Sequence, residues 1–242
     1  MKCIRLLTLI LFTFQTSFVL AEQVFNSGSK QISLVELYTS EGCSSCPPAD
    51  RWFSRLKDTD KLWKSYVPVA FHVDYWNQLG WKDRFSHSTY SKRQRHYKRK
   101  GNINSVYTPG FVVAGKEWRG WFRGKKLPDQ QEIEAGSLQL TLSDNDFQAQ
   151  FQSEISDLRL RLNVATLAMS QTTPVRQGEN SGKRLQHDFV VIELDSFETK
   201  SGKWQGHLSS LDNDEIHAIA AWVSLANDPT PIQAVGGYLK SE

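Results

Sequence analysis

The segment "VELYTSEGCSSCPPAD", residues 35–50, joins an apolar stretch to a Cys-x-x-Cys motif and two consecutive prolines. The apolar stretch, residues 32–38, is typical of a buried strand. Proline is tolerated in the first turn of a helix and excluded from its interior, so a helix is expected to begin directly after the motif. The segment therefore predicts that Cys43 and Cys46 lie at the junction of a strand and a helix.

A cysteine pair at such a junction is suited to redox chemistry. The free amides and the positive dipole end of a helix N-terminus stabilise a thiolate, which is the reactive form of cysteine. Cys43 is expected to be the exposed nucleophile, and Cys46, one turn further along, is expected to resolve the mixed disulfide. A purely structural role is disfavoured, because a disulfide that closes so short a loop removes little chain entropy.

The first 21 residues have the layout of a secretory signal. Lys2 and Arg5 precede an apolar run at residues 6–14, and Ala21 stands at a suitable cleavage position. The alternative is an N-terminal membrane anchor, but the run is shorter than the ~20 residues that a span needs. We therefore expect residues 1–21 to be a cleaved signal peptide and the protein to be periplasmic or secreted, with no stable membrane span.

Strand-like and helix-like stretches alternate between residues 31 and 140, which favours an α/β domain with a mixed sheet. After the first strand and helix, strands are expected at residues 67–73, 111–113 and 117–122, and helices at residues 86–100 and 128–136. From residue 137 the pattern changes to about seven short strands, as in an antiparallel sandwich. We place the domains at residues 22–136 and 137–242, and expect the second to be an all-β, sandwich-like domain.

Two further features accompany the cysteines. Glu36 lies inside the apolar strand, where a carboxylate is costly unless it is neutral or paired. Such an acid could relay a proton to or from Cys46; the alternative is a glutamate on a solvated strand face. Pro109, in "VYTPGF", precedes another expected strand and reads on its own as a turn proline.

The stretch "FHVDYWNQLGW", residues 71–81, is dense in aromatic side chains. Ligands bind at the carboxyl ends of strands in open α/β sheets, so its loop could form a substrate-binding wall beside the cysteines. The candidates for that wall are Asp74, Tyr75, Trp76 and Trp81. The alternative is that the aromatic residues cover the core or the domain interface, and His72 is expected to be a hydrogen-bonded core histidine.

The stretch "KRQRHYKRK", residues 92–100, is strongly basic, whereas the whole chain carries a formal charge of only +3. A basic run in a cytosolic protein would suggest nucleic acid as the partner, but export argues against it. We expect a solvated helix face and no nucleic acid partner, with an anionic surface or an acidic protein as the alternative.

Residues 32–136 resemble the thioredoxin superfamily in their order of elements, in the motif Cys43-Ser44-Ser45-Cys46 and in the pair Thr108-Pro109. More narrowly, the chain is similar to an exported, thioredoxin-like family known as domain of unknown function 1223. The similarity lies in four segments: "VELYTSEGCSSCPPAD", "FHVDYWNQLGWKDRF" with "RQRHY", "VYTPGFVV" and "GENSGKRLQHDFVV".

This resemblance implies a thioredoxin-like domain, with a mixed sheet and helices on both of its faces, followed by a β-rich domain. It implies that Pro109 follows a cis peptide bond and faces the cysteine pair, with Thr108 contributing to substrate binding. Gly110 departs from the family pattern, in which a glutamine is expected, and glycine has no side chain to contact a bound partner at this position.

The sequence thus predicts a thiol–disulfide oxidoreductase that acts on protein thiols or disulfides and uses neither a cofactor nor a metal. Cys43, Cys46, Pro109 and Glu36 are its candidate catalytic residues. One alternative is a non-catalytic binding or assembly protein. Another is copper handling, in which the two thiolates and a histidine would hold the metal; zinc normally takes four protein ligands, and the motif supplies two.

Overall fold

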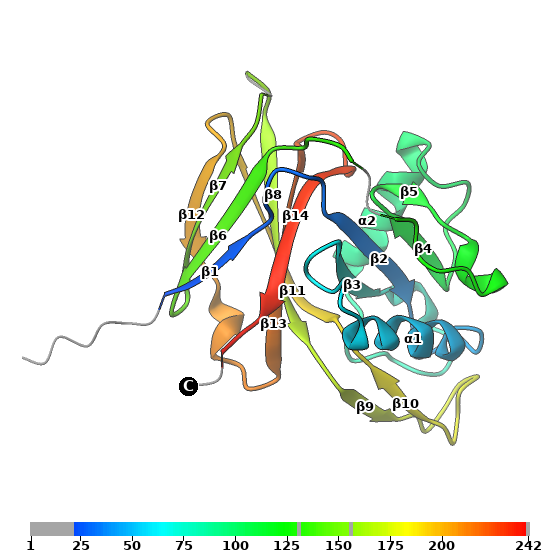
Figure 1. Cartoon of the computed structure of the whole chain (residues 1–242). Coiled ribbons are helices and arrows are strands. Elements are labelled where there is room, and N and C mark those ends of the chain that lie inside the picture. The colour runs from blue at the N-terminus through cyan, green and yellow to red at the C-terminus, as the bar shows by residue number, and fades with distance from the viewer. Residues whose placement is uncertain (1–21, 130–131, 155–156, 241–242) are drawn as a thin grey trace, which may run out of the picture.

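The computed structural model describes residues 22–129, 132–154 and 157–240, so the predicted signal peptide lies outside the described residues. These residues form three β-sheets and two α-helices, α1 (Pro47–Ser54) and α2 (Ser88–Lys100), as Figure 1 shows. The strands are β1 (Gln23–Asn26), β2 (Ser33–Thr39), β3 (Tyr66–His72), β4 (Gly110–Val113), β5 (Lys116–Glu117), β6 (Ser137–Ser143), β7 (Asp146–Gln152), β8 (Leu160–Ala168), β9 (Gln171–Pro174), β10 (Arg184–His187), β11 (Val190–Thr199), β12 (Lys203–His207), β13 (Ile216–Leu225) and β14 (Pro231–Tyr238). Short 3₁₀ segments are η1 (Arg55–Asp58), η2 (Asp74–Trp76), η3 (Gly120–Arg123) and η4 (Ser209–Asp212).

The largest sheet has eight strands in the order β14-β13-β8-β11-β3-β2-β4-β5. Within it, β2 runs parallel to β3 and antiparallel to β4. β11 pairs with β3 in parallel through Val190 and Ala70, and the amide of Ala70 donates to the carbonyl of Phe189 at 2.8 Å. This pairing joins strands from both predicted domains into one sheet; the boundary at residue 136 stays a prediction.

The fold class predicted from the sequence, a thioredoxin-like α/β domain with helices on both faces followed by an all-β domain, is wrong. The described residues are mostly strand, in several sheets, and they contain two α-helices. The helix expected at residues 128–136 is absent from its described part, where Glu134 forms a β-bridge with Lys30. One long-range contact that local patterns do not show is the pairing of β3 with β11, which continues the sheet beyond β3 into strands of the second predicted domain.

Side chains alternate along β2 between two core clusters, as strand geometry requires. Tyr38 belongs to the cluster that contains Tyr97 of α2. Leu37 belongs to the cluster that contains Phe53 of α1. Glu36 shares the face of Tyr38, so it points away from α1 and the loop that carries the cysteines.

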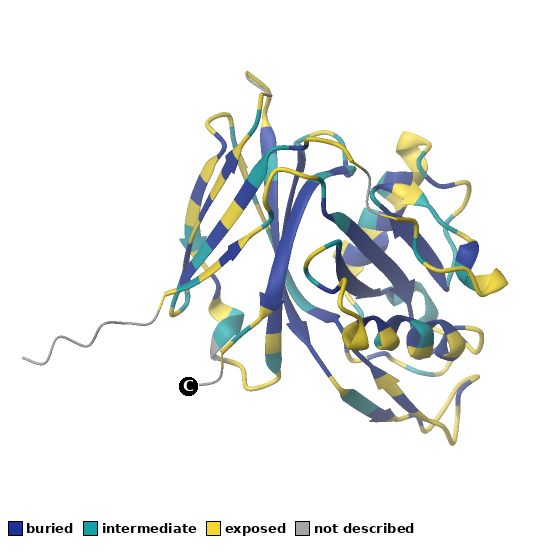
Figure 2. Cartoon of the chain, viewed as in Figure 1, coloured by how far each residue is buried: buried dark blue, intermediate teal, exposed yellow. Residues whose placement is uncertain are grey.

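The four-stranded sheet, in the order β1-β6-β7-β12, packs on the far end of the large sheet. Buried side chains of β6 and β7, such as Leu138 and Phe147, meet those of β8 and β13, such as Leu162 and Val223. Figure 2 shows the resulting dark interior between the two sheets and the exposed outer strand faces.

The third sheet is a hairpin of β9 and β10, and it lies beside α1 (Figure 1). The hairpin therefore brings a segment of the second predicted domain to the helix that follows the cysteines. No helix in the described part of the chain is long and apolar enough to span a membrane.

Candidate functional site

The cysteine loop, residues 40–46, connects β2 to α1. Cys46 is the N-cap residue of α1, and Pro47 opens the helix, as predicted. The amide of Cys43 donates to the carbonyl of Ser40 at 3.1 Å, and the amide of Cys46 donates to the carbonyl of Cys43 at 3.2 Å. Tight turns therefore hold both cysteines, which are free thiols, at the helix N-terminus.

The two thiols differ in acidity. The hydrogen bond from the Cys46 thiol lowers the pKa of Cys43 to about 6, although burial opposes this change. Hydrogen bonds from Ser45 and Thr108 lower it further, and the Ser45 hydroxyl lies 3.2 Å from Cys43 Sγ. Burial raises the pKa of Cys46 well above its usual range, and the hydrogen bond to Cys43 and the charge on that sulfur add to this rise. The thiolate form is therefore favoured at Cys43 relative to Cys46.

Cys43 is not the exposed nucleophile that the sequence predicts, since both cysteines are 0 % exposed. The tip of the β9–β10 hairpin covers the cysteine loop. Asn180 Nδ2 donates to the carbonyls of Glu41, at 2.8 Å, and Cys43, at 2.9 Å. Glu179 Oε2 accepts from the amide of Ser44 at 3.0 Å. A partner can reach Cys43 only after a local movement that exposes its sulfur.

The segment around Pro109 lies beside the cysteines. The Thr108–Pro109 peptide bond is cis, as the resemblance implies. Hydrogen bonding by the Thr108 side chain lowers the pKa of both Cys43 and Cys46, and its hydroxyl accepts from Trp76 Nε1 at 2.8 Å. Of the predicted site residues, Thr108 and Trp76 therefore join the cysteine pair.

Tyr75 lies at the edge of the same site. Burial raises its pKa, and the charges of the two cysteines contribute to that rise. The absence of a side chain at Gly110 follows from crowding, because a Cβ there would lie 2.8 Å from the backbone carbonyl oxygen of Tyr107 and 3.2 Å from the side-chain Nε2 of Gln94.

The other two predicted wall residues direct their polar atoms elsewhere. The Asp74 carboxylate accepts a hydrogen bond from Ser91 of α2. Trp81 Nε1 donates to Glu41 Oε2 at 2.8 Å, so this indole stabilises the cysteine loop through the side chain of Glu41. Both residues position neighbouring segments around the cysteine site.

Glu36 does not serve the cysteines. It is fully buried on the α2 face of the sheet, where Arg93 binds both carboxylate oxygens, at 2.8 and 3.1 Å. The hydroxyls of Tyr38 and Tyr97 donate to the same carboxylate. Glu36 is therefore a paired structural carboxylate, and one cation of the basic stretch, Arg93, is a buried partner rather than part of a solvated helix face.

Asp50 is the acid that the sequence interpretation missed. It lies on α1 four residues after Cys46, so both side chains share one helix face. Asp50 is 5 % exposed, and Thr39 Oγ1 donates to its Oδ1 at 2.8 Å. Burial raises its pKa, while its charge helps to raise the pKa of Cys46. An acid four residues after the second cysteine was the available signal.

Two buried histidines, His72 and His187, lie near Asp50. Only His72 was considered from the sequence. His72 Nδ1 donates to Asp83 Oδ2 at 2.7 Å, which identifies it as the hydrogen-bonded core histidine expected. Its ring lies across that of His187, with centroids 4.9 Å apart. Among the described residues, no group of three or more His, Cys, Asp or Glu side chains has the arrangement to hold a metal ion.

Together, the fold and the site define a mostly-β protein with a Cys-x-x-Cys pair at the N-terminus of a short helix. Residues 34–224 match the family model described as "Protein of unknown function (DUF1223)", so the chain belongs to this family. No curated protein matches the chain.

Two solved structures are similar to it. Protein AGR_C_4864 from Agrobacterium tumefaciens has 22% identity and a TM-score of 0.62, covering 87% of this chain and 95% of that one. HBP35 of Porphyromonas gingivalis has 13% identity and a TM-score of 0.54, covering 88% of this chain and 76% of that one. At these identities the likeness concerns the fold alone.

Proposed function

We propose that this protein is an exported thiol–disulfide oxidoreductase that exchanges disulfides with protein partners through Cys43 and Cys46. The observation that carries the proposal is the contrast between the two thiols: Cys43 has a pKa of about 6, and the pKa of the buried Cys46 is raised. The signal-like layout of residues 1–21 supports export. Disulfides persist in the oxidising compartments that such proteins reach.

In the reducing direction, the Cys43 thiolate attacks one sulfur of a partner disulfide. A bond between Cys43 and the partner forms as the partner's S–S bond breaks, and the released partner thiolate takes a proton from water. Cys46 then loses its proton and attacks Cys43 Sγ, which releases the second partner thiolate. Two electrons pass to the partner and a Cys43–Cys46 disulfide remains; the reverse steps oxidise a partner dithiol.

We assign Asp50 as the base that takes the proton from Cys46. The two side chains share a face of α1, and the charge of Asp50 acts on the Cys46 thiol. Burial raises the pKa of Asp50, which brings its proton affinity closer to that of a thiol. Glu36, bound to Arg93 on the opposite face of the sheet, is not available for this step.

A second candidate function, a non-catalytic binding or assembly protein, is favoured by one observation. Both thiols are buried, and Glu179 and Asn180 fasten the hairpin tip over the cysteine loop. In such a protein the loop would stay closed, and Cys43 would not react with disulfides at a useful rate.

Trapping separates the two candidates. The variant Cys46→Ser is expected to accumulate a mixed disulfide through Cys43 when it is incubated with a disulfide-containing model protein, because the resolving thiol is gone. The adduct is measured by mass spectrometry under non-reducing conditions. The wild-type protein should resolve it, and Cys43→Ser should form none. No adduct with Cys46→Ser, or an equal yield with Cys43→Ser, would favour the non-catalytic protein.

A further inference from the structure

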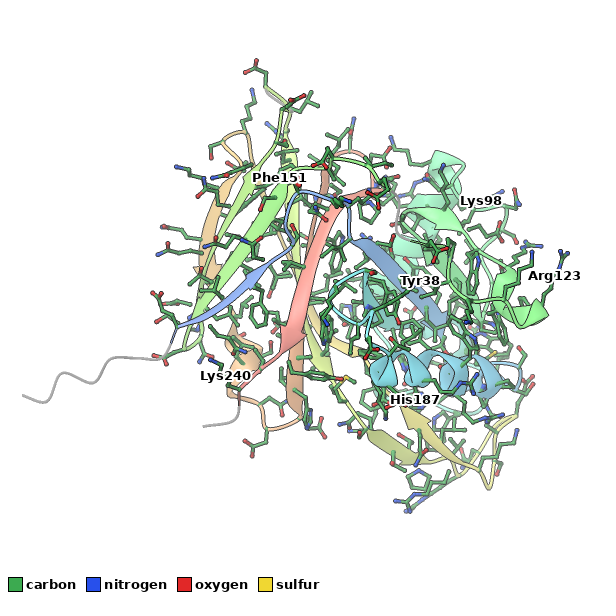
Figure 3. The ribbon with its side chains drawn as sticks, in the orientation of Figure 1. Tyr38, Lys98, Arg123, Phe151, His187 and Lys240 are labelled. Atoms are coloured by element: carbon green, nitrogen blue, oxygen red, sulfur yellow. The ribbon has the colours of Figure 1, made fainter. Side chains whose placement is uncertain are left out.

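A cluster of buried titratable side chains lies around Asp50 and His187, near the N-terminus of α1. Its members come from the cysteine loop, α1, β3, the segment after η2 and the end of β10: Glu41, Asp50, His72, Asp83 and His187. Each is at most 5 % exposed. Figure 3 shows His187 beside α1, where the β9–β10 hairpin delivers it from the second predicted domain.

Several polar atoms of this cluster have no hydrogen-bond partner, although they are buried. They are Glu41 Oε1, Asp50 Oδ2, His72 Nε2 and both ring nitrogens of His187. Buried polar groups are normally paired, so a concentration of unpaired atoms at one place calls for an explanation, such as a catalytic role. These atoms do not converge on one point that a metal ion could occupy.

His187 lies between two of the unpaired carboxylate oxygens. Its Nδ1 is 3.8 Å from Asp50 Oδ2, and its Nε2 is 3.6 Å from Glu41 Oε1. Both separations are slightly longer than a hydrogen bond, so a small shift of the ring closes either one. An imidazole can accept a proton on one nitrogen and release another from the opposite nitrogen.

The surroundings favour a mobile proton at this place. Burial opposes a charge on His72, but the charge of Asp83 and its hydrogen bond raise the pKa of His72 overall. The charges that face His187 from other elements are thus Glu41, Asp50 and the His72–Asp83 pair. Its neighbour Asp188 is engaged by Lys57 Nζ at 2.9 Å. His187 therefore has carboxylates on both sides and no fixed partner for either nitrogen.

We propose that His187 is a proton-relay residue for the Cys46 step, linking Asp50 to Glu41; this inference rests on the function proposed above. When Cys46 attacks Cys43, its proton passes to Asp50. Asp50 then gives that proton to His187 Nδ1, and His187 gives the proton on Nε2 to Glu41. The proton stays in the cluster while the cysteines form a disulfide, and it returns along the same path when the disulfide is reduced.

With this relay, the redox site contains residues from both predicted domains. The cysteines, Asp50 and Glu41 come from the first predicted domain, whereas His187 comes from the hairpin of the second. A crevice of about 60 Å³ between α1 and β10, lined in part by Asp50 and Arg184, is large enough for water. It offers the alternative route, in which Asp50 exchanges its proton with solvent directly.

The test follows Cys43 and Cys46 in the reduced protein of residues 22–242, which lacks Cys3 of the predicted signal peptide, with an aromatic disulfide that releases a coloured thiolate. Attack by Cys43 releases the first coloured thiolate, and attack by Cys46 on the mixed disulfide releases the second. Between pH 5.5 and 9, the rate of the first phase should rise with a midpoint near pH 6, the pKa of Cys43. It should be the same in the wild type and in His187→Gln.

The second phase reports the relay. We expect His187→Gln to slow it at least tenfold and to change its pH profile, and Glu41→Gln to do the same from the other end. His187→Asn places an amide donor near Asp50 but cannot pass a proton, so it should resemble His187→Gln. The control His207→Gln changes an exposed histidine and should leave both phases unchanged. Thermal unfolding identifies any variant that does not fold.

The two hypotheses fail in different ways. If the wild type shows neither phase, the proposed function is wrong. If the wild type shows both, but the second phase keeps its rate and pH profile in His187→Gln, the relay is wrong and Asp50 exchanges its proton through the crevice. Recovery of the second phase in His187→Asn would also overturn the relay, since it would reduce His187 to a structural hydrogen-bond donor. If His187→Gln does not fold, the outcome with Glu41→Gln decides.

Discussion

Replacing Arg93 with leucine is expected to lower the free energy of unfolding by about 3–5 kcal/mol, because it leaves a buried charge without its partner. Glu36 is fully buried, and Arg93 binds both of its carboxylate oxygens. The guanidinium also lies over the ring of Trp222, 5.0 Å from its centroid. Urea unfolding measures the loss.

Two control variants test whether the unpaired charge of Glu36 causes the loss of stability in Arg93→Leu. Arg99→Leu removes an exposed cation from the same helix and should change stability by less than about 0.5 kcal/mol. The double variant Glu36→Gln with Arg93→Leu removes both charges and should recover part of the loss. A loss below about 1 kcal/mol in the single variant would mean that Glu36 is neutral or reaches water.

Phe189→Ala is expected to cost about 3–5 kcal/mol, the range for truncating a buried phenylalanine. The ring is 0 % exposed and packs edge-on against Phe53 of α1 and Trp63. It stands directly before β11, where the strands of the two predicted domains meet. The variant should lower the urea midpoint when unfolding is followed by tryptophan fluorescence and by the reactivity of Cys43.

Phe122→Ala is the matched control, because this phenylalanine is 59% exposed. It should change stability by less than about 1 kcal/mol. Different midpoints for the two probes would mean that the chain does not unfold as one unit. A coincident shift would mean that the eight-stranded sheet unfolds as one unit.

Local structure was the part that the sequence could predict. The strand before the cysteines, the helix start at Pro47 and the basic helix α2 each follow from patterns within a few residues. The pairing of Val190 with Ala70 could not be predicted, because it joins residues far apart in the chain and no local pattern encodes such a pair. This pairing joins the expected small sheet to the strands of the second segment, whereas the predicted fold class is wrong because the described residues are mostly strand and contain two α-helices.

In the candidate site, too, residues in local motifs could be predicted and residues placed by long-range contacts could not. The cysteine pair and Thr108 were predictable from their motifs. The direction of Glu36 was not, since a strand buried on both faces gives no hydrophobic alternation to show which face holds the helix α1. Asp50 was within reach of sequence reasoning through its four-residue spacing from Cys46. His187 was not, because only the folded hairpin brings it to α1.

The reduction potential of the Cys43–Cys46 pair tests the proposed function most directly. The protein of residues 22–242, without the predicted signal peptide and its Cys3, is equilibrated in glutathione buffers of defined ratio, and the fraction of disulfide is measured by alkylation and mass spectrometry. A redox-active pair should give a two-electron transition with a midpoint between about −270 and −120 mV, the range of thiol–disulfide oxidoreductases. A midpoint below about −300 mV, as for structural disulfides, or cysteines that stay reduced in the most oxidising buffer, would contradict the redox function.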